Sequence, residues 1–261
     1  MRIFFALAAM VLFFAVGATA QTTNDSVEAI IQGRKLVLKL LEQRPTENFT
    51  NTGTLKIRNS KGERSEIPIK CEVLITATNW QNIYEAFFTN TSEKLVFIHP
   101  DDQTHQLEGD FPDGGSIVGL RDVQRGSNLY KHTYPAAGRS NRETFANSDF
   151  WIADLGLEFF HWPQQKVLPK MTNLKRGRDY TLLESTNPNP ATNGYSRVLS
   201  WIDKESGGIL AAEAYDAKGE KLKEFWPKSF KKVNGQWELQ EMEIDNVQTG
   251  SRTRLEFDLK K

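Results

Sequence analysis

The chain of 261 residues contains a single cysteine, Cys71. One thiol excludes an internal disulfide framework and any metal site built from several thiolates. No apolar run reaches the roughly 20 residues that a membrane-spanning helix needs. An excess of one charge is also missing, because Lys plus Arg and Asp plus Glu each total 33. That balance gives no electrostatic case for binding nucleic acid or an anionic membrane.

The N-terminus has the pattern of an export signal. Arg2 is followed by an apolar run over residues 3–16 and then by Ala18-Thr19-Ala20, a small-x-small sequence typical of a signal-peptidase site. We therefore expect cleavage after Ala20, which leaves residues 21–261 as one domain. An uncleaved membrane anchor is the alternative.

Two segments have the periodicity of amphipathic helices. Over residues 25–43 the apolar side chains recur at three-and-four spacing, Asp25 and Glu28 match a capping box, and Pro45 follows the end. Residues 148–162 show the same spacing and are unusually aromatic. We expect each segment to lay one apolar face on a sheet. We expect the second segment to act as a movable lid, and a permanent core helix is the alternative.

The remaining pattern is that of strands. Residues 67–77 alternate apolar and polar side chains, and Cys71 falls in the apolar series, which favours a buried core thiol over a nucleophile. A slip in the alternation between Leu239 and Met242 predicts a bulge or a strong bend. Residues 99–148 show no regular pattern, and we expect only short strands there. Further strands are expected over residues 54–58, 83–89, 94–99, 179–185, 195–203, 208–215, 221–226, 237–245 and 253–259.

Short turns such as Asn234-Gly235 separate the strands of the C-terminal third, so neighbouring strands should pair antiparallel. Neither a repeat nor a linker interrupts the series. The sequence therefore predicts a mainly β fold, a single highly curved antiparallel sheet covered by α-helices.

Motifs for catalysis or metal binding are missing. No two of the four histidines have the i, i+4 spacing of a helical zinc site, and neither a G-x-S-x-G elbow nor a dinucleotide fingerprint occurs. Carboxylate pairs such as Glu241 with Glu243 are better explained as solubilising side chains of a sheet. We therefore assign no catalytic residue, metal ligand or cofactor, and we do not expect an enzyme.

Large aromatic side chains are the distinctive content of the chain. Most of them should simply fill the core. A curved sheet closed by helices nevertheless leaves an apolar cavity between its layers, where ligands commonly bind. The residues expected to line such a cavity or its lid are Phe150, Trp151, Leu155, Phe159, Trp162, Trp201 and Trp226.

One motif leads to a family. Residues 147–155, Asn-Ser-Asp-Phe-Trp-Ile-Ala-Asp-Leu, resemble the Ser-Asp-Phe…Asp-Leu signature of the outer-membrane lipoprotein-sorting proteins of the LolA-like superfamily. Residues 201–204, 214–219, 221–225 and 249–253 resemble, in order, further motifs of that family. The resemblance covers residues 145–261 well and residues 27–99 by pattern only.

The resemblance implies an open, incomplete antiparallel β-barrel, LolA/LolB-like, with a helical lid over a hydrophobic cavity. It further implies a periplasmic carrier that binds acyl chains of lipoproteins or lipids for outer-membrane sorting. Its expected partners are an acylated lipoprotein or lipid, an inner-membrane release complex and an outer-membrane acceptor, and no nucleic acid. A monomer is expected.

Two other functions stay open at this point. The first is a non-transporting cell-envelope scaffold or sensor of the same fold, whose cavity is filled by its own side chains. The second is a glycan or lipid hydrolase.

Overall fold

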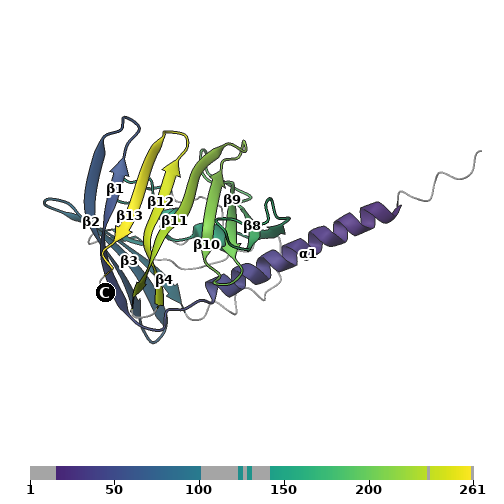
Figure 1. Cartoon of the computed structure of the whole chain (residues 1–261), viewed down its shortest axis with the longest axis horizontal. Coiled ribbons are helices and arrows are strands. Elements are labelled where there is room, and N and C mark those ends of the chain that lie inside the picture. Colours follow the sequence, from purple (N-terminus) through teal and green to yellow (C-terminus); the bar gives the residue numbers. More distant parts are fainter. Residues whose placement is uncertain (1–15, 101–122, 126–127, 131–141, 234–235, 260–261) are drawn as a thin grey trace, which may run out of the picture.

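Eleven strands form one antiparallel sheet in the order β4-β3-β2-β1-β13-β12-β11-β10-β9-β8-β7 (Figure 1). The structure is a computed structural model that describes residues 16–100, 123–125, 128–130, 142–233 and 236–259. The strands of the sheet are β1 (Phe49–Arg58), β2 (Arg64–Ile75), β3 (Asn79–Phe87), β4 (Ser92–Pro100), β7 (Gln164–Leu168), β8 (Tyr180–Thr186), β9 (Arg197–Asp203), β10 (Ile209–Tyr215), β11 (Lys221–Val233), β12 (Gln236–Asn246) and β13 (Ser251–Phe257).

The sheet curls but does not close. Its two edges are β4 and β7, and the described residues of these strands do not pair with each other. The predicted mainly β fold and the open barrel are therefore confirmed. The short hairpin of β5 (Val123–Arg125) and β6 (Asn128–Tyr130) accounts for two of the short strands expected between residues 99 and 148. Most other residues of that stretch lie outside the described ranges.

The two meanders of the chain join in the middle of the sheet. β1 pairs antiparallel with β13, so that Leu55 lies opposite Leu255. Both leucines are 1% exposed and belong to the same apolar cluster on the concave face. This pairing fixes the first strands of the chain against its last strand.

Side-chain alternation divides the core between the two faces of the sheet. On β9, Val198 and Ile202 belong to a concave cluster together with Phe160, whereas Leu199 and Trp201 belong to a separate cluster on the convex face. The concave face therefore carries the larger core, and covering segments complete it.

The first cover is α1 (Val16–Leu41), whose C-terminal part crosses β7. Gly33 permits this contact, because a Cβ at that position would lie 2.6 Å from the backbone carbon of Gln165. The N-terminal part of α1 extends away from the sheet (Figure 1). The helix starts well before residue 25, so the predicted Asp25 capping box is wrong. Within the described ranges, no helix is both long and apolar enough to cross a bilayer.

The bulge predicted between Leu239 and Met242 is confirmed. Pro227 pairs with Met242 and Phe230 with Leu239, and the register slips twice between these pairs. β11 continues through this irregularity to Val233, although the sequence pattern predicted its end at Trp226. β7 was not predicted, because only five residues follow Pro163 before the next turn.

The second cover differs from the predicted helix over residues 148–162. It consists of the four-residue α2 (Ile152–Leu155) and the short 3₁₀ helix η2 (Glu158–His161), separated by Leu157 in the left-handed region at φ 49°. Helical periodicity correctly marked an apolar segment. Hydrogen bonds from Thr253 and Lys223 to Asp149, and the isolated bridge between Thr144 and Trp151, hold residues 149–151 in a non-helical path.

Candidate functional site

Residues 145–162 form what we call the plug, a segment that packs on the concave face of the sheet. Its first half is buried together with side chains of β1 to β4, β12 and β13. Two consecutive residues with left-handed backbone, Ala146 and Asn147, turn the chain back, and the Phe145 N–H donates to the Phe150 carbonyl over 2.9 Å. This compact turn presents Phe145 and Phe150, each 1% exposed, to the core.

Asp149 ties the plug to β13. The Thr253 hydroxyl donates to Asp149 Oδ2 over 2.8 Å, and its oxygen accepts the Asp149 backbone N–H over 2.9 Å. The Ser251 hydroxyl donates to the second carboxylate oxygen over 2.5 Å. Asp149 is 8% exposed and Thr253 is fully buried, so the anchor lies out of reach of solvent.

The second half of the plug packs between α1 and the strands β8 to β10. Phe159, Phe160 and Trp162 share a cluster with Val37 of α1. The buried Gln165 side chain donates to the Phe159 and Trp162 carbonyls, 2.9 Å each, and accepts the Ser185 hydroxyl over 2.7 Å. The end of the plug is therefore hydrogen-bonded to the sheet as well.

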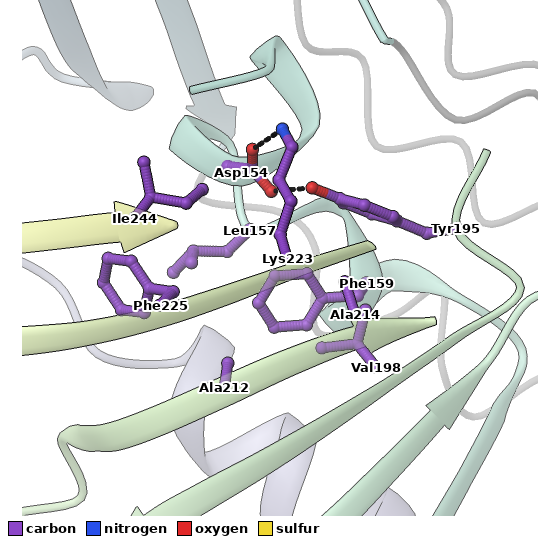
Figure 2. Close-up of a pocket in the computed structure, with 10 residues that line it drawn as sticks. All are labelled: Asp154, Leu157, Phe159, Tyr195, Val198, Ala212, Ala214, Lys223, Phe225 and Ile244. Carbon is purple, nitrogen blue, oxygen red and sulfur yellow. Dashed lines mark hydrogen bonds and ion pairs between the residues drawn. The ribbon is translucent and has the colours of Figure 1, made fainter. Parts of the chain in front are cut away.

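A buried lysine lies under the middle of the plug (Figure 2). Lys223 projects from β11, and its Nζ donates to Asp154 Oδ2 over 3.0 Å and to the Asp149 carbonyl over 2.6 Å. The Tyr195 hydroxyl donates to the other Asp154 oxygen over 2.7 Å. The Lys223 ammonium also lies 3.7 Å from the centre of the Trp151 ring, a favourable cation–π distance.

Burial changes the protonation equilibria of this cluster. It lowers the pKa of Lys223 to about 8, although Asp154 and Asp149 favour the charged form and oppose the change. Burial also raises the pKa of Tyr195 well above its usual value, and the charge of Asp154 adds to the rise. The cluster is thus a buried ion pair whose lysine has a lowered pKa of about 8.

Two neighbouring hollows lie on the concave face, and the plug lines the first of them. The first has a volume of about 480 Å³, and the second about 510 Å³. Both are lined in part by Asn82, Tyr84 and Leu239. The first is bordered mainly by apolar side chains of α1, the plug, β10, β11 and β12, among them Leu40, Leu41, Phe150, Leu155, Leu157, Phe160, Ile209, Phe225, Phe230 and Met242.

Polar and ionisable side chains also line these hollows, among them His99 and Asp154 in the first and Glu72 and Glu238 in the second. In the described part of the chain, no three His, Cys, Asp or Glu side chains gather closely enough to hold a metal ion. Cys71 lines the second hollow, but burial raises the pKa of its thiol to about 12 and so suppresses the nucleophilic thiolate. The first hollow offers mainly apolar contacts to a ligand.

The residues expected to line the cavity or lid occupy three environments. Phe150 and Leu155 border the first hollow. Phe159 borders a small cavity of about 30 Å³ around Lys223, and Trp162 packs edge-on against Phe159. Trp151 stacks on Tyr195 with ring centres 4.6 Å apart.

The remaining two, Trp201 and Trp226, lie on the convex face of the sheet. They share a cluster there with Tyr180, and the connection between β7 and β8 covers them: Lys175 lies 3.9 Å above the Trp201 ring. The structure therefore does not bring them to the plug.

Sequence reasoning missed Lys223, Tyr195 and Asp154 as a cluster. One signal was available, because Lys223 stands two residues before Phe225 on the same strand and therefore on the same face. A lysine in phase with core residues predicts a buried charge that needs a partner.

A family model whose description is "Uncharacterized protein" matches residues 130–260, half of the chain. The chain belongs to that family. No curated protein matches this family member. The matched half contains the plug and all strands from β7 to β13.

Solved structures share the fold of this family member. A putative outer membrane lipoprotein-sorting protein domain from Vibrio parahaemolyticus matches with a TM-score of 0.60 and 18% identity, over 88% of this chain and 92% of that chain. A DUF1329 family protein from Desulfovibrio piger matches with 0.57 and 16%, over 88% and 91%. A LolA superfamily protein from Nitrosomonas europaea matches with 0.52 and 14%, over 87% and 91%. The predicted likeness to lipoprotein-sorting proteins of the LolA-like superfamily is confirmed for the fold.

Proposed function

We propose that the protein is a carrier of hydrophobic ligands that holds an acyl chain on the concave face of its sheet. The observation that supports this most directly is the apolar hollow of about 480 Å³ next to the plug. Its volume falls within the roughly 300–1,000 Å³ range of small-molecule sites. Burying an acyl chain there contributes about 0.8 kcal/mol for each methylene removed from water.

The fold supports a more specific assignment. One of the similar structures is described as a putative outer membrane lipoprotein-sorting protein domain and another as a LolA superfamily protein. The N-terminal sequence of this chain has the pattern of an export signal. We therefore propose a periplasmic protein whose cargo is the acyl chain of a lipoprotein or lipid. Transfer from an inner-membrane release complex to an outer-membrane acceptor is part of the same proposal.

In this proposal the plug stays in place during ligand binding. Asp149 and Lys223 hold it to β13 and β11 through buried hydrogen bonds, which favours a permanent core segment over a movable lid. The ligand then enters between the plug and the strand ends that border the hollow, which include Phe230 and Leu239.

The direct test is native mass spectrometry of the protein purified from its membrane-containing host. If the protein is a carrier, its measured mass should include bound compounds of the mass of an acyl chain or lipid, and extraction with organic solvent should remove them. If the protein is instead a scaffold or sensor with a filled cavity, it should be free of lipid and should not bind a fluorescent fatty-acyl probe.

Variants locate the site. Leu239→Glu and Met242→Glu place a charge in the wall of the hollow and should weaken binding of the acyl probe by at least about tenfold, because the charge must be desolvated. Val247→Glu is the matched control, since Val247 is 48% exposed and lies in the turn at the opposite end of β12. Equal binding by all three variants would refute this site.

A further inference from the structure

Several segments at one end of the sheet carry exposed apolar side chains. The antiparallel register places five segments at this end. They are the start of β1, the end of β2, the connection between β7 and β8, the turn between β9 and β10, and the hairpin of β11 and β12. We call this end the mouth rim. Its exposed apolar residues are Phe49 (46% exposed), Leu74 (37%), Met171 (62%), Leu174 (54%), Phe230 (53%) and Trp237 (71%).

The mouth rim also borders the ligand hollow. Gly207 of the turn between β9 and β10, Phe230 of β11 and Leu239 of β12 line the first hollow, and Phe49 lines the second. Whatever surface covers the mouth rim therefore lies next to both hollows.

Basic side chains accompany the apolar ones. The connection between β7 and β8, residues 169–179, carries Lys170, Lys175, Arg176 and Arg178 against one carboxylate, Asp179, and the end of β11 adds Lys228, Lys231 and Lys232. Carboxylates at the same end, among them Asp203, Glu205 and Glu238, balance part of this positive charge. The cations that remain available to a partner are therefore those without a carboxylate of their own.

Several of these cations are not neutralised by carboxylates. Lys170 pairs with Asp179, Arg178 with Asp203 and Glu205, and Lys228 with Glu243. Lys175 instead stacks on Trp201, and the Arg176 guanidinium lies 5.5 Å from the centre of the Trp226 ring. Among the described residues, neither Lys175 nor Arg176 has a carboxylate partner. The Trp201 and Trp226 rings hold these two cations in place. Met171 and Leu174 precede them in the same connection between β7 and β8.

We propose that the mouth rim docks on the surface of an anionic phospholipid bilayer. Met171, Leu174, Phe230 and Trp237 enter the boundary between headgroups and acyl chains, and Lys175, Arg176 and Lys232 contact lipid phosphates. Exposed Trp, Phe, Leu and Met side chains among Lys and Arg match both layers of such a surface. An acidic protein would match the cations but would leave four large apolar side chains in water. This docking goes beyond the carrier function and does not depend on what the hollows hold.

The test is sedimentation of the exported, host-processed protein with two kinds of vesicle, phosphatidylcholine alone and phosphatidylcholine mixed with phosphatidylglycerol. The protein should sediment with the mixed vesicles and only weakly with phosphatidylcholine, and added salt should reduce binding. Lys175→Gln with Arg176→Gln should lower the partition coefficient by roughly an order of magnitude or more, since each cation near the surface adds to binding.

The double variant Met171→Glu with Leu174→Glu tests the apolar contacts and should abolish sedimentation. The matched control is Phe87→Glu with Val247→Glu, because these residues are 40% and 48% exposed at the opposite end of the sheet. Circular dichroism should show unchanged thermal midpoints for both pairs. The proposal is wrong if the wild-type protein does not sediment with the mixed vesicles, which is the result expected of a rim that binds an acidic protein. It is also wrong if the rim pair and the control pair lose binding equally. The acyl-probe assay is independent, so failure of docking and failure of carriage are distinguished.

Discussion

Lys223 Nζ lies 3.0 Å from Asp154 Oδ2, and this ion pair connects β11 with the plug. The Lys223 side chain is 3% exposed and the Asp154 side chain 13%. Removing two charges from water costs free energy that their mutual attraction does not always recover, so the pair need not stabilise the fold in total. Breaking it by removing one partner is costly in any case, because the other charge stays buried.

Asp154→Ala should lower the free energy of unfolding by about 3–5 kcal/mol, because it leaves Lys223 buried without its carboxylate. Lys223→Met should have a smaller effect, since the Tyr195 hydroxyl and the Trp151 N–H still donate to Asp154. The double variant should lose less stability than the two single changes add up to. Urea unfolding of all four proteins measures this coupling, and purely additive effects would show that the two groups act independently.

Stability should rise with pH between about 8 and 10 because of Lys223. Its pKa is about 8 in the folded protein and near 10.5 when unfolded, so the unfolded chain binds more protons in this range and folding gains from raising the pH. Tyr195 opposes the trend above pH 10, since its folded pKa is raised. The rise amounts to about 3 kcal/mol at most.

The measurement is the difference in unfolding free energy between wild type and Lys223→Met at several pH values. That difference removes the contribution of all other groups that titrate equally in both proteins. A difference that stays flat from pH 7 to 10 would mean that Lys223 keeps its ordinary pKa.

The open sheet could be predicted from sequence because its strands alternate cleanly and are joined by short turns. Even the bulge opposite Pro227 left a trace, in the slip of phase between Leu239 and Met242. The plug could not be predicted in the same way. Its apolar spacing is helical, but tertiary hydrogen bonds from Thr253, about 100 residues away in sequence, decide the path of Asp149.

The candidate site was predicted by residue type and misjudged in part by position. Phe150 and Leu155 were found because the plug is apolar and aromatic throughout. Trp201 was assigned to the same cavity, although strand parity alone did not say which face of the sheet it occupies. That assignment requires knowing which face the plug covers, which is a property of the whole fold and not of β9.

Gly33→Ala tests how closely α1 packs on β7. In an exposed helix this change stabilises by up to about 1 kcal/mol, because glycine is a poor helix former. Here a Cβ would lie 2.6 Å from the Gln165 backbone, so the helix must shift and we expect destabilisation of about 1–3 kcal/mol. The sign of the change in thermal midpoint decides between the two cases, and Gln32→Ala on the same helix is the control.

Thr253→Val tests whether the plug is a permanent part of the core. Valine keeps the shape of threonine but removes one hydrogen bond to the Asp149 carboxylate and one from its N–H, both buried. We expect a loss of about 2–3 kcal/mol. If the plug belongs to the core, the whole protein loses this stability, and the thermal midpoint falls by roughly 5–10 °C for a domain of this size.

A movable plug would respond differently to Thr253→Val. Amides of residues 145–155 would exchange with solvent faster, while the midpoint and the exchange of β8 and β9 amides would hardly change. Hydrogen exchange measured by mass spectrometry separates the two outcomes. Thr52→Val is the matched control, because Thr52 also donates to an aspartate, Asp258, but on the exposed surface. Its loss should stay within about 0.5 kcal/mol, since water replaces the missing partner there.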